Sequence, residues 1–183
     1  MDVINLLAID PGSNIGVSIY TLSVPDLQII NLETTFIDLS YFDSKDPDIN
    51  RLRNKLIHLE ACIDSLMDEY QPHILAIEDT FVNFRFPKSA VFLAQYIATV
   101  ELAVSRRNPF IQIYKYAPKY IKASVGAKGN ADKFMMMDRV SEISEITNFI
   151  STRTLSEHEI DSLAIGYITV NYIRENPGVL FTM

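Results

Sequence analysis

Three acidic residues stand where predicted secondary-structure elements end or begin. Asp10 follows an apolar run, Glu78 closes a second apolar run, and Asp161 lies in the first turn of the predicted last helix. His158 precedes Asp161 by three residues, which places both side chains on one face of that helix. Carboxylates that converge repel one another, and Mg²⁺ or Mn²⁺ relieves the repulsion through oxygen ligands. Two such ions about 3.5–4 Å apart can hold the attacking and leaving oxygens of a phosphodiester displacement.

Each of these signals also has an ordinary structural interpretation. An acidic residue at a strand end is most often a turn former or a helix cap, and Asp-Pro-Gly-Ser at residues 10–13 is also plain turn chemistry. A histidine such as His158 is more often exposed or capping than a metal ligand. The combination of such residues across three separate segments is what favours a site.

The elements that must position these residues follow from hydrophobic periodicity. Three strands come first, joined by turns short enough to link antiparallel neighbours. A helix, a strand, a second helix and a further strand follow, and the rest of the chain is helical. We expect strands over residues 6–10, 16–22, 28–38, 73–78 and 110–114, and helices over residues 51–70, 89–106, 118–124, 131–146 and 158–174.

This order predicts one α/β domain over residues 1–183. Its mixed five-stranded sheet has three antiparallel strands and then two parallel ones, with helices on both faces. A sheet of this kind places its chemistry at the ends of its strands. The first and fourth strands can be neighbours, so Asp10 and Glu78 can converge.

Charge is distributed unevenly along the chain. The whole sequence has 16 basic and 23 acidic residues, a net charge of −7, yet residues 85–139 hold 10 basic and only 3 acidic ones. A local positive face is enough for phosphate contacts, although a solvated helix face is the simpler interpretation. The candidate contacts to DNA phosphates in this segment are Arg85, Lys115, Lys119, Lys122, Lys128 and Lys133.

Composition excludes several other classes of protein. The single cysteine, Cys62, rules out an internal disulfide framework. No run approaches the ~20 apolar residues that span a bilayer, and the N-terminus lacks a basic start followed by an apolar run. We therefore expect a cytoplasmic protein with no membrane partner, in a bacterial cell or in a virus-infected host cell.

Four segments of the chain resemble the motifs of one known family, the RuvC-type Holliday junction resolvases. They occur in the family's order and spread across nearly the whole chain. The third of these segments, residues 122–133, is the most specific, because it fixes two lysines eleven residues apart around a glycine loop. The matching segments are residues 7–13 (Leu-Ala-Ile-Asp-Pro-Gly-Ser) with Gly16, residues 76–81, residues 122–133, and residues 158–166.

The resemblance implies a ribonuclease H-like fold and a homodimer that cuts four-way DNA junctions with Mg²⁺ or Mn²⁺, two ions per active site. By position, Asp10, Glu78 and Asp161 are then metal ligands. His158 takes the place of a fourth ligand that in many members is aspartate, and it could instead act as a general acid or base. Glu159 and its neighbour Glu157 are adjacent alternatives to His158.

The resemblance also assigns roles to residues that would contact DNA. Lys122 and Lys133 match the family's functional lysines, which would hold the scissile phosphate and offset charge in the transition state. Phe81 matches an aromatic residue that meets bases at the junction centre, with a core phenylalanine as the alternative. Arg85 lies between two phenylalanines, and this run could extend the aromatic surface that meets the bases. The chain departs from many relatives at Gly126, which they place one residue later.

The sequence thus predicts a crossover junction endodeoxyribonuclease for recombination, repair or viral genome processing, leaving 5′-phosphate and 3′-hydroxyl ends. Surplus apolar surface on the helix over residues 89–104 could pair with a second copy, or that helix could be buried within one monomer. A flap or fork nuclease, a ribosomal-RNA processing nuclease of the same fold, and a non-catalytic junction-binding protein remain as alternatives. An actin-like ATPase would need a second lobe, for which the chain is too short. A partner helicase cannot be read from one chain.

Overall fold

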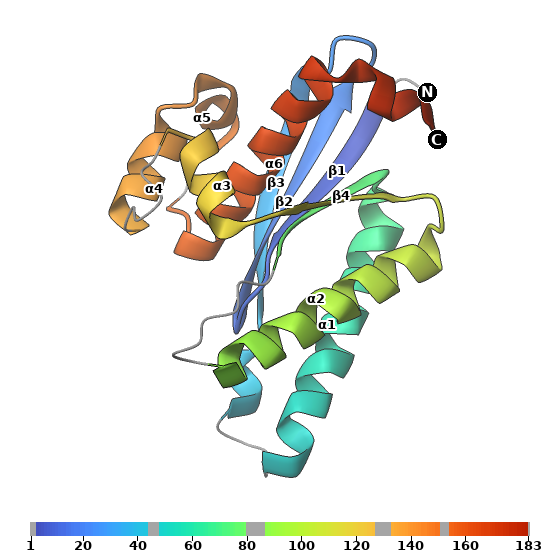
Figure 1. Ribbon diagram of the computed structural model, residues 1–183, viewed down its shortest axis with the longest axis vertical. Helices are drawn as coiled ribbons and strands as arrows, with labels where there is room; N and C mark the ends of the chain where they lie inside the picture. The colour runs from blue at the N-terminus through green and yellow to red at the C-terminus, as the bar shows by residue number, and fades with distance from the viewer. Residues whose placement is uncertain (1–2, 44–47, 80–86, 127–132, 151–153, 183) are drawn as a thin grey trace.

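The structure is a computed structural model, and it shows one sheet between two layers of helices (Figure 1). It describes residues 3–43, 48–79, 87–126, 133–150 and 154–182.

The five strands form one mixed sheet with the order β3-β2-β1-β4-β5. The first three strands pair antiparallel, and β4 pairs parallel with both β1 and β5. This confirms the predicted sheet of three antiparallel strands followed by two parallel ones. The strands are β1 (Val3–Asp10), β2 (Asn14–Ser23), β3 (Ile29–Asp38), β4 (Ile74–Glu78) and β5 (Gln112–Tyr116).

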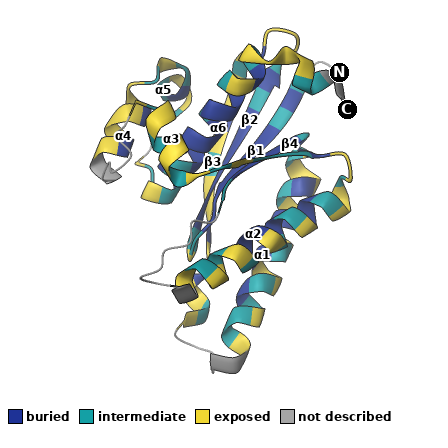
Figure 2. Ribbon diagram, viewed as in Figure 1, coloured by how far each residue is buried: buried dark blue, intermediate teal, exposed yellow. Residues whose placement is uncertain are grey.

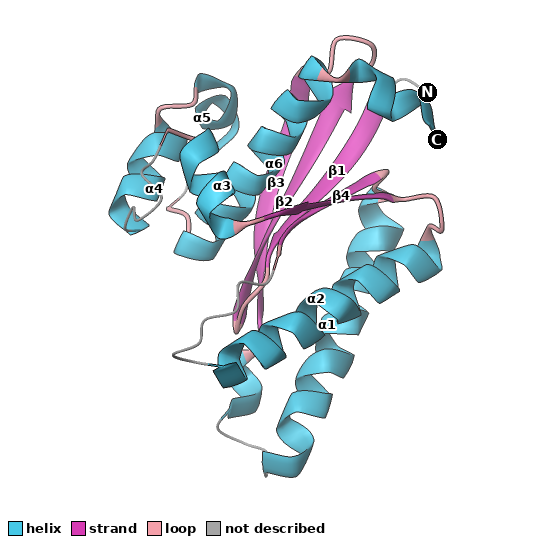
Figure 3. Cartoon of the chain, viewed as in Figure 1, coloured by secondary structure: helices cyan, strands magenta, loops and turns pink. Residues whose placement is uncertain are grey.

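The helices cover both faces of the sheet (Figure 3). The first two helices pack against each other on one face, and the last helix crosses the other face, with three short helices beside it. No described helix combines the length and the apolar composition that a membrane span needs. The helices are α1 (Asp48–Tyr70), α2 (Pro87–Arg107), α3 (Pro118–Ser124), α4 (Lys133–Ser141), α5 (Ser144–Ile150) and α6 (Glu157–Glu175), with 3-10 turns at Ser40–Asp43 and Pro177–Thr182.

The central strand β1 is buried on both faces, as its continuous apolar run predicts. Leu6 and Ala8 point into the core beneath α6, whereas Leu7 and Ile9 point into the core beneath α1 and α2. This is the two-residue alternation of a strand. Figure 2 shows the buried residues gathered along the sheet and on the helix sides that face it. The end of β1 that carries Asp10 is therefore held between two packed layers.

One predicted helix is wrong: residues 131–146 do not form a single helix. The structure has α4 and α5 there, and Glu142 and Ile143 lie between them. The Ser141 hydroxyl donates to the Asp138 carbonyl oxygen (2.7 Å), and the Ile143 carbonyl oxygen accepts the first backbone bonds of α5. Serine side chains that bond the local backbone in this way favour helix ends over helix interiors.

The last strand begins two residues later than the predicted range 110–114. The Phe110 backbone N–H donates to the Asn108 side-chain oxygen at 3.1 Å, which holds these residues in a turn. Phe110 is 83% exposed, so this aromatic residue is not part of a strand buried in the sheet. The shift matters for the site, because it places Tyr116 level with Glu78 across the β4–β5 pair.

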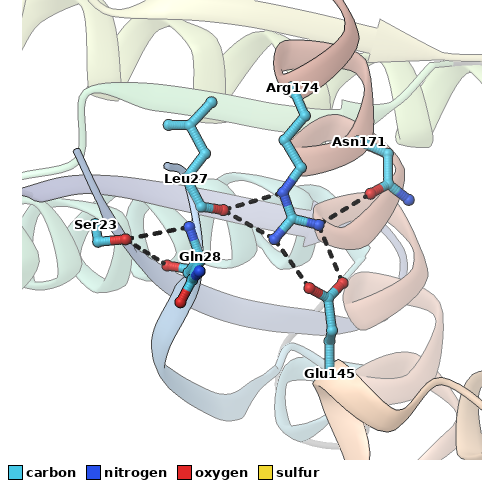
Figure 4. Close-up of polar contacts among 6 residues, drawn as sticks. All are labelled: Ser23, Leu27, Gln28, Glu145, Asn171 and Arg174. Atoms are coloured by element: carbon cyan, nitrogen blue, oxygen red, sulfur yellow. Dashed lines mark hydrogen bonds and ion pairs between the residues drawn. The ribbon is translucent and has the colours of Figure 1, made fainter. Parts of the chain in front are cut away.

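The C-terminal part of α6 is tied to the rest of the fold by one arginine (Figure 4). The Arg174 guanidinium donates to the Leu27 carbonyl oxygen from two nitrogens, at 3.1 and 2.9 Å. It also forms a two-bond pair with the Glu145 carboxylate, both bonds at 3.0 Å, and reaches the Asn171 side-chain oxygen at 3.3 Å. All five N–H donors of the guanidinium can be used in this arrangement. Arg174 thereby links α6 to α5 and to the β2–β3 turn.

Candidate active site

Two carboxylates lie side by side at the ends of neighbouring strands. Ile9 and Ile77 are partners in the parallel β1–β4 register, so Asp10 and Glu78, which follow them, end the two strands together. Ala8 belongs to the core beneath α6, and the two-residue repeat of a strand turns Asp10 to that same face. Asp10 is 8% exposed, an unusually low value for a carboxylate. The predicted convergence of these two strand ends is present in the fold.

The start of α6 is brought against this strand end by a glycine. Gly16 on β2 is the partner of Asp10 on β1, and a Cβ atom at Gly16 would overlap the His158 backbone carbonyl. Only glycine therefore lets the helix approach the strand so closely. Gly16 belongs to the first of the sequence motifs, and this contact is the physical reason for a glycine there.

Further along β2, alternate residues hold the body of α6. The Ser18 hydroxyl donates to the Ser162 carbonyl oxygen at 2.9 Å, and the buried Tyr20 hydroxyl donates to the Leu163 carbonyl oxygen at 2.7 Å. The Tyr20 ring also occupies the space that a Cβ atom at Gly166 would need. These contacts fix the rotation of α6 about its own axis and its position along the sheet. They therefore also fix where its acidic face lies.

The histidine on α6 contacts the first carboxylate directly. His158 Nδ1 lies 3.0 Å from Asp10 Oδ2. An ionised carboxylate only accepts, so with Asp10 ionised the proton of a neutral imidazole lies on Nδ1. The helix begins at Glu157, which places Asp161 in its second turn, not in the first turn that the sequence predicted.

The charges of the acidic side chains from β1, β4 and α6 affect one another's ionisation. Burial raises the pKa of Glu78 to about 8, and the charges of Asp10 and Asp161 add to this rise. Burial also raises the pKa of Asp161 to about 6, with a further contribution from Asp10. Lys122 acts in the opposite direction on the pKa of both groups, and His158 on that of Asp161. Burial and mutual repulsion therefore both disfavour the ionised forms of Glu78 and Asp161.

Glu159, the alternative to His158, has a structural role instead. It is 2% exposed, and its carboxylate accepts from the Ser156 backbone N–H (2.9 Å) and hydroxyl (2.8 Å). The Ser156 oxygen in turn accepts from the Glu159 N–H, which completes a capping box. Thr34 on β3 donates to the other Glu159 oxygen at 3.0 Å. The Ser-x-x-Glu spacing is a sequence signal that could have identified this role.

The basic residues predicted to contact DNA separate into distinct places. Lys122 lies at the end of α3, where it influences the pKa of both Glu78 and Asp161, and Lys119 is exposed on the same helix. Lys115 instead pairs with Glu101 on α2, so it is directed away from the acidic side chains. Lys133 begins α4, but its side chain is outside the described part of the structure, as are Phe81, Arg85 and Lys128.

The acidic side chains do not form a ready coordination shell. Among the described residues, no three His, Cys, Asp or Glu side chains are grouped closely enough to hold one metal ion. The donor set nevertheless fits a hard divalent cation, because it offers carboxylate oxygens with a net negative charge in a half-buried position.

Comparison with known proteins gives consistent matches. A family model described as crossover junction endodeoxyribonuclease RuvC matches residues 6–169. The crossover junction endodeoxyribonuclease RuvC of Helicobacter pylori (strain Shi470) is 29% identical over 153 residues, covering 83% of this chain and 89% of the relative. The protein of the same name from Helicobacter acinonychis (strain Sheeba) is 28% identical over 171 residues, covering 93% and 98%.

Solved structures share the fold. Thermus thermophilus RuvC superposes with a TM-score of 0.69 at 18% identity, covering 94% of this chain and 97% of that one. The same protein in complex with Holliday junction substrate gives a TM-score of 0.68 at 17% identity, with coverage of 94% and 96%. The yeast mitochondrial Holliday junction resolvase gives 0.60 at 13% identity, covering 94% and 81%. The sequence match over residues 6–169 spans both strand-end carboxylates and the acidic part of α6, and the chain belongs to the crossover junction endodeoxyribonuclease RuvC family.

Proposed function

We propose that this protein is a crossover junction endodeoxyribonuclease that resolves four-way DNA junctions by paired symmetric nicks. One observation carries the proposal: Asp10 and Glu78 end neighbouring strands, and the charge of Asp10 raises the pKa of both Glu78 and Asp161. Family membership supplies the substrate class, and a relative of the same fold is known in complex with Holliday junction substrate. The activity belongs to DNA recombination and repair or to viral genome processing.

The acidic residues are proposed to hold two Mg²⁺ or Mn²⁺ ions through Asp10, Glu78 and Asp161, with His158 as a fourth ligand. When bound, the ions supply a nucleophile at neutral pH and stabilise the attacking and leaving oxygens of an in-line displacement. The raised pKa values of Glu78 and Asp161 are consistent with this role, because a nearby cation favours the ionised carboxylates. The 3′-oxygen would be the group that leaves the phosphorus, so the products would have 5′-phosphate and 3′-hydroxyl ends.

The protein's own residues position the reacting groups. His158 orients the Asp10 carboxylate through the hydrogen bond at Nδ1. The carboxylate is therefore held in one orientation for the reaction. Lys122, at the edge of the acidic group, is placed to hold the scissile phosphate and to offset the charge that develops on its oxygens. Lys133 joins it in this proposal, and Lys119, Lys128, Arg85 and Phe81 contact the DNA on either side.

A homodimer suits two symmetric cuts, and the outer face of α1 and α2 is where we place its interface. Val91 (57% exposed), Leu102 (67%) and Ile57 (52%) project from these helices. A groove of about 470 Å³ runs between the helices beside Leu102 and Ile57. Apolar side chains gathered on one face are typical of a protein interface. Light scattering should give a dimer mass, and Leu102→Glu should shift it to that of a monomer.

The proposal is tested by cleavage of a labelled four-way junction beside a matched linear duplex, a flap and a structured RNA. We expect paired symmetric nicks in the junction alone, in Mg²⁺ or Mn²⁺, with none in chelator. Resealing of the nicks by a DNA ligase checks the 5′-phosphate and 3′-hydroxyl ends. Equal cutting of flaps would make the protein a broader branched-DNA nuclease, and preferred cutting of RNA would make it a processing ribonuclease. Tight junction binding without cutting in either metal would contradict the enzymatic activity.

A further inference from the structure

A pair of tyrosine rings lies beside the acidic group and has no part in the function proposed above. Tyr116 ends β5 and is the register partner of Glu78, and its carbonyl oxygen accepts from the Asp79 backbone N–H at 2.9 Å. The Tyr116 ring is stacked on the ring of Tyr120 from α3, with centroids 5.7 Å apart and planes only 8° from parallel. The aromatic pair is therefore attached to the strand next to the site.

The two rings have different surroundings. Tyr116 is partly buried, and burial raises the pKa of its hydroxyl to about 12. Tyr120 is 51% exposed although one face of its ring is stacked on Tyr116. Scattered exposed aromatic residues are common on proteins. The Tyr120 ring differs from these because it is stacked on the ring of Tyr116, which is partly buried. The stack holds the exposed Tyr120 ring in one orientation, so little conformational entropy is lost when a further ring packs on it.

The short helix that carries Tyr120 also carries two lysines, on other sides of its axis. Lys119 is exposed next to Tyr120, and Lys122 lies close enough to Glu78 and Asp161 to lower the pKa of both. α3 thus carries an exposed aromatic ring and two lysines, and Lys122 is the one near the carboxylates. Aromatic planes flanked by basic side chains are how proteins hold unpaired nucleotides, with the base stacked and the phosphate paired.

We propose that Tyr120, backed by Tyr116, is a stacking platform for an unpaired base of the strand that is cut. The inference rests on the proposed function and adds a substrate contact to that same site. Lys122 holds the scissile phosphate, and a base of the same strand, freed from pairing where the strands exchange, reaches round α3 to lie on the Tyr120 ring. The platform thereby favours a branched substrate, because a fully paired duplex keeps its bases inside the helical stack.

The test measures binding to a four-way junction by fluorescence anisotropy, in the full chain carrying Asp10→Asn so that cutting does not interfere. We expect Tyr120→Leu to weaken junction binding about 5- to 150-fold, the range that loss of one base–aromatic stack produces. Tyr120→Phe keeps the ring and should bind like the parent. The matched control is Tyr172→Leu: Tyr172 is 38% exposed and packs edge-on against Tyr114, which is level with Ala76 and so farther from the carboxylates.

Removal of the base itself separates stacking from a general effect on the fold. Single abasic residues are placed at each position around the nick that the wild-type protein makes. At one position, base loss should weaken binding by the parent as much as Tyr120→Leu does, and should not weaken binding by Tyr120→Leu further. Additive losses at every position, or equal losses in Tyr120→Phe and Tyr120→Leu, would overturn the platform. If wild-type protein cuts junctions but shows no such coupling, only this inference fails. If it neither binds nor cuts them, the proposed function fails as well.

Discussion

His158 Nδ1 and Asp10 Oδ2 lie 3.0 Å apart and join residues that are 148 positions apart in the chain. The bond connects the start of α6 to the end of β1, next to the point where Gly16 lets the two elements meet. His158 therefore contacts the carboxylate directly, although a third of its side chain is exposed. Its chemistry should be visible in how the protein uses metal ions.

The first prediction concerns metal preference. Imidazole is a softer ligand than carboxylate and suits Mn²⁺ better than Mg²⁺. We expect His158→Asp, which supplies an oxygen ligand in its place, to raise junction cleavage in Mg²⁺ relative to cleavage in Mn²⁺. His158→Ala should lower the rate about 10- to 100-fold in both metals, as loss of a residue that orients a ligand does. A His158→Asp protein with the parent's ratio of rates would exclude His158 from the metal site.

The second prediction concerns the stability of the protein without metal as pH changes. The pKa of Glu78 is raised to about 8 in the fold, from an ordinary value of 4.5, and that of Asp161 is raised to about 6 from 3.8. The folded state thus binds more protons than the unfolded state between these values. Its stability is fully retained below the ordinary pKa values and is lost as pH rises through the raised ones. The melting temperature in chelator should therefore fall from about pH 4.5 to pH 8.

Glu78→Gln isolates the contribution of one carboxyl group to this loss. At pH 8 it should raise the melting temperature by at least about 2–4 °C, the effect of about 1 kcal/mol in a domain of this size. At pH 4 the gain should vanish, and at pH 8 Mg²⁺ should stabilise the parent more than the variant. Glu175→Gln, at an exposed position in α6, is the control. A gain that is the same at both pH values would contradict the buried-charge explanation.

The third prediction concerns the close approach of α6 to β2. Gly16→Ala should push the helix away from the sheet, because the new methyl group overlaps the His158 carbonyl. We expect a loss of about 1–3 kcal/mol in the free energy of unfolding, as for other overpacked sites, together with a large loss of junction cleavage. Gly178→Ala is the matched control, since a Cβ there meets nothing within 4 Å. Full activity in Gly16→Ala would show that the position of His158 is not critical.

The fourth prediction concerns the arginine that joins α6, α5 and the β2–β3 turn. Arg174→Ala removes bonds to both the Glu145 carboxylate and the Leu27 carbonyl oxygen, so we expect a loss of about 1–3 kcal/mol in urea unfolding. Arg139→Ala breaks only the exposed pair with Glu142 and should cost about 0.5 kcal/mol or less. Equal effects of the two substitutions would mean that the Arg174 contacts add no more than a surface ion pair.

Much of the fold could be predicted because its signals are local. The antiparallel order of the first three strands follows from short turns, and the buried strand before Glu78 follows from a continuous apolar run. The meeting of Asp10 and Glu78 follows from these two elements once β1 and β4 are neighbours. In each case the periodicity of nearby residues carries the information.

The parts that could not be predicted depend on contacts between distant residues. Nothing near Gly16 shows that a helix more than 140 positions later lies against it. The partner that directs Lys115 away from the site, Glu101, is on a different element. The role of Glu159 was missed for another reason: its capping-box spacing was present in the sequence, but its position beside His158 made it resemble a ligand.

The central claim is that the three carboxylates from β1, β4 and α6 act as one metal-dependent centre for junction cleavage. The most direct measurement is the single-turnover rate of junction cleavage in Mg²⁺ for Asp10→Asn, Glu78→Gln and Asp161→Asn, alone and in pairs, with Asp138→Asn on α4 as the control. Each single substitution should abolish cleavage without abolishing junction binding, and the pairs should lose no more than the single variants, because residues that act as a unit are not additive. If any one of the three single variants cleaves the junction as fast as the Asp138→Asn control does, the account is contradicted.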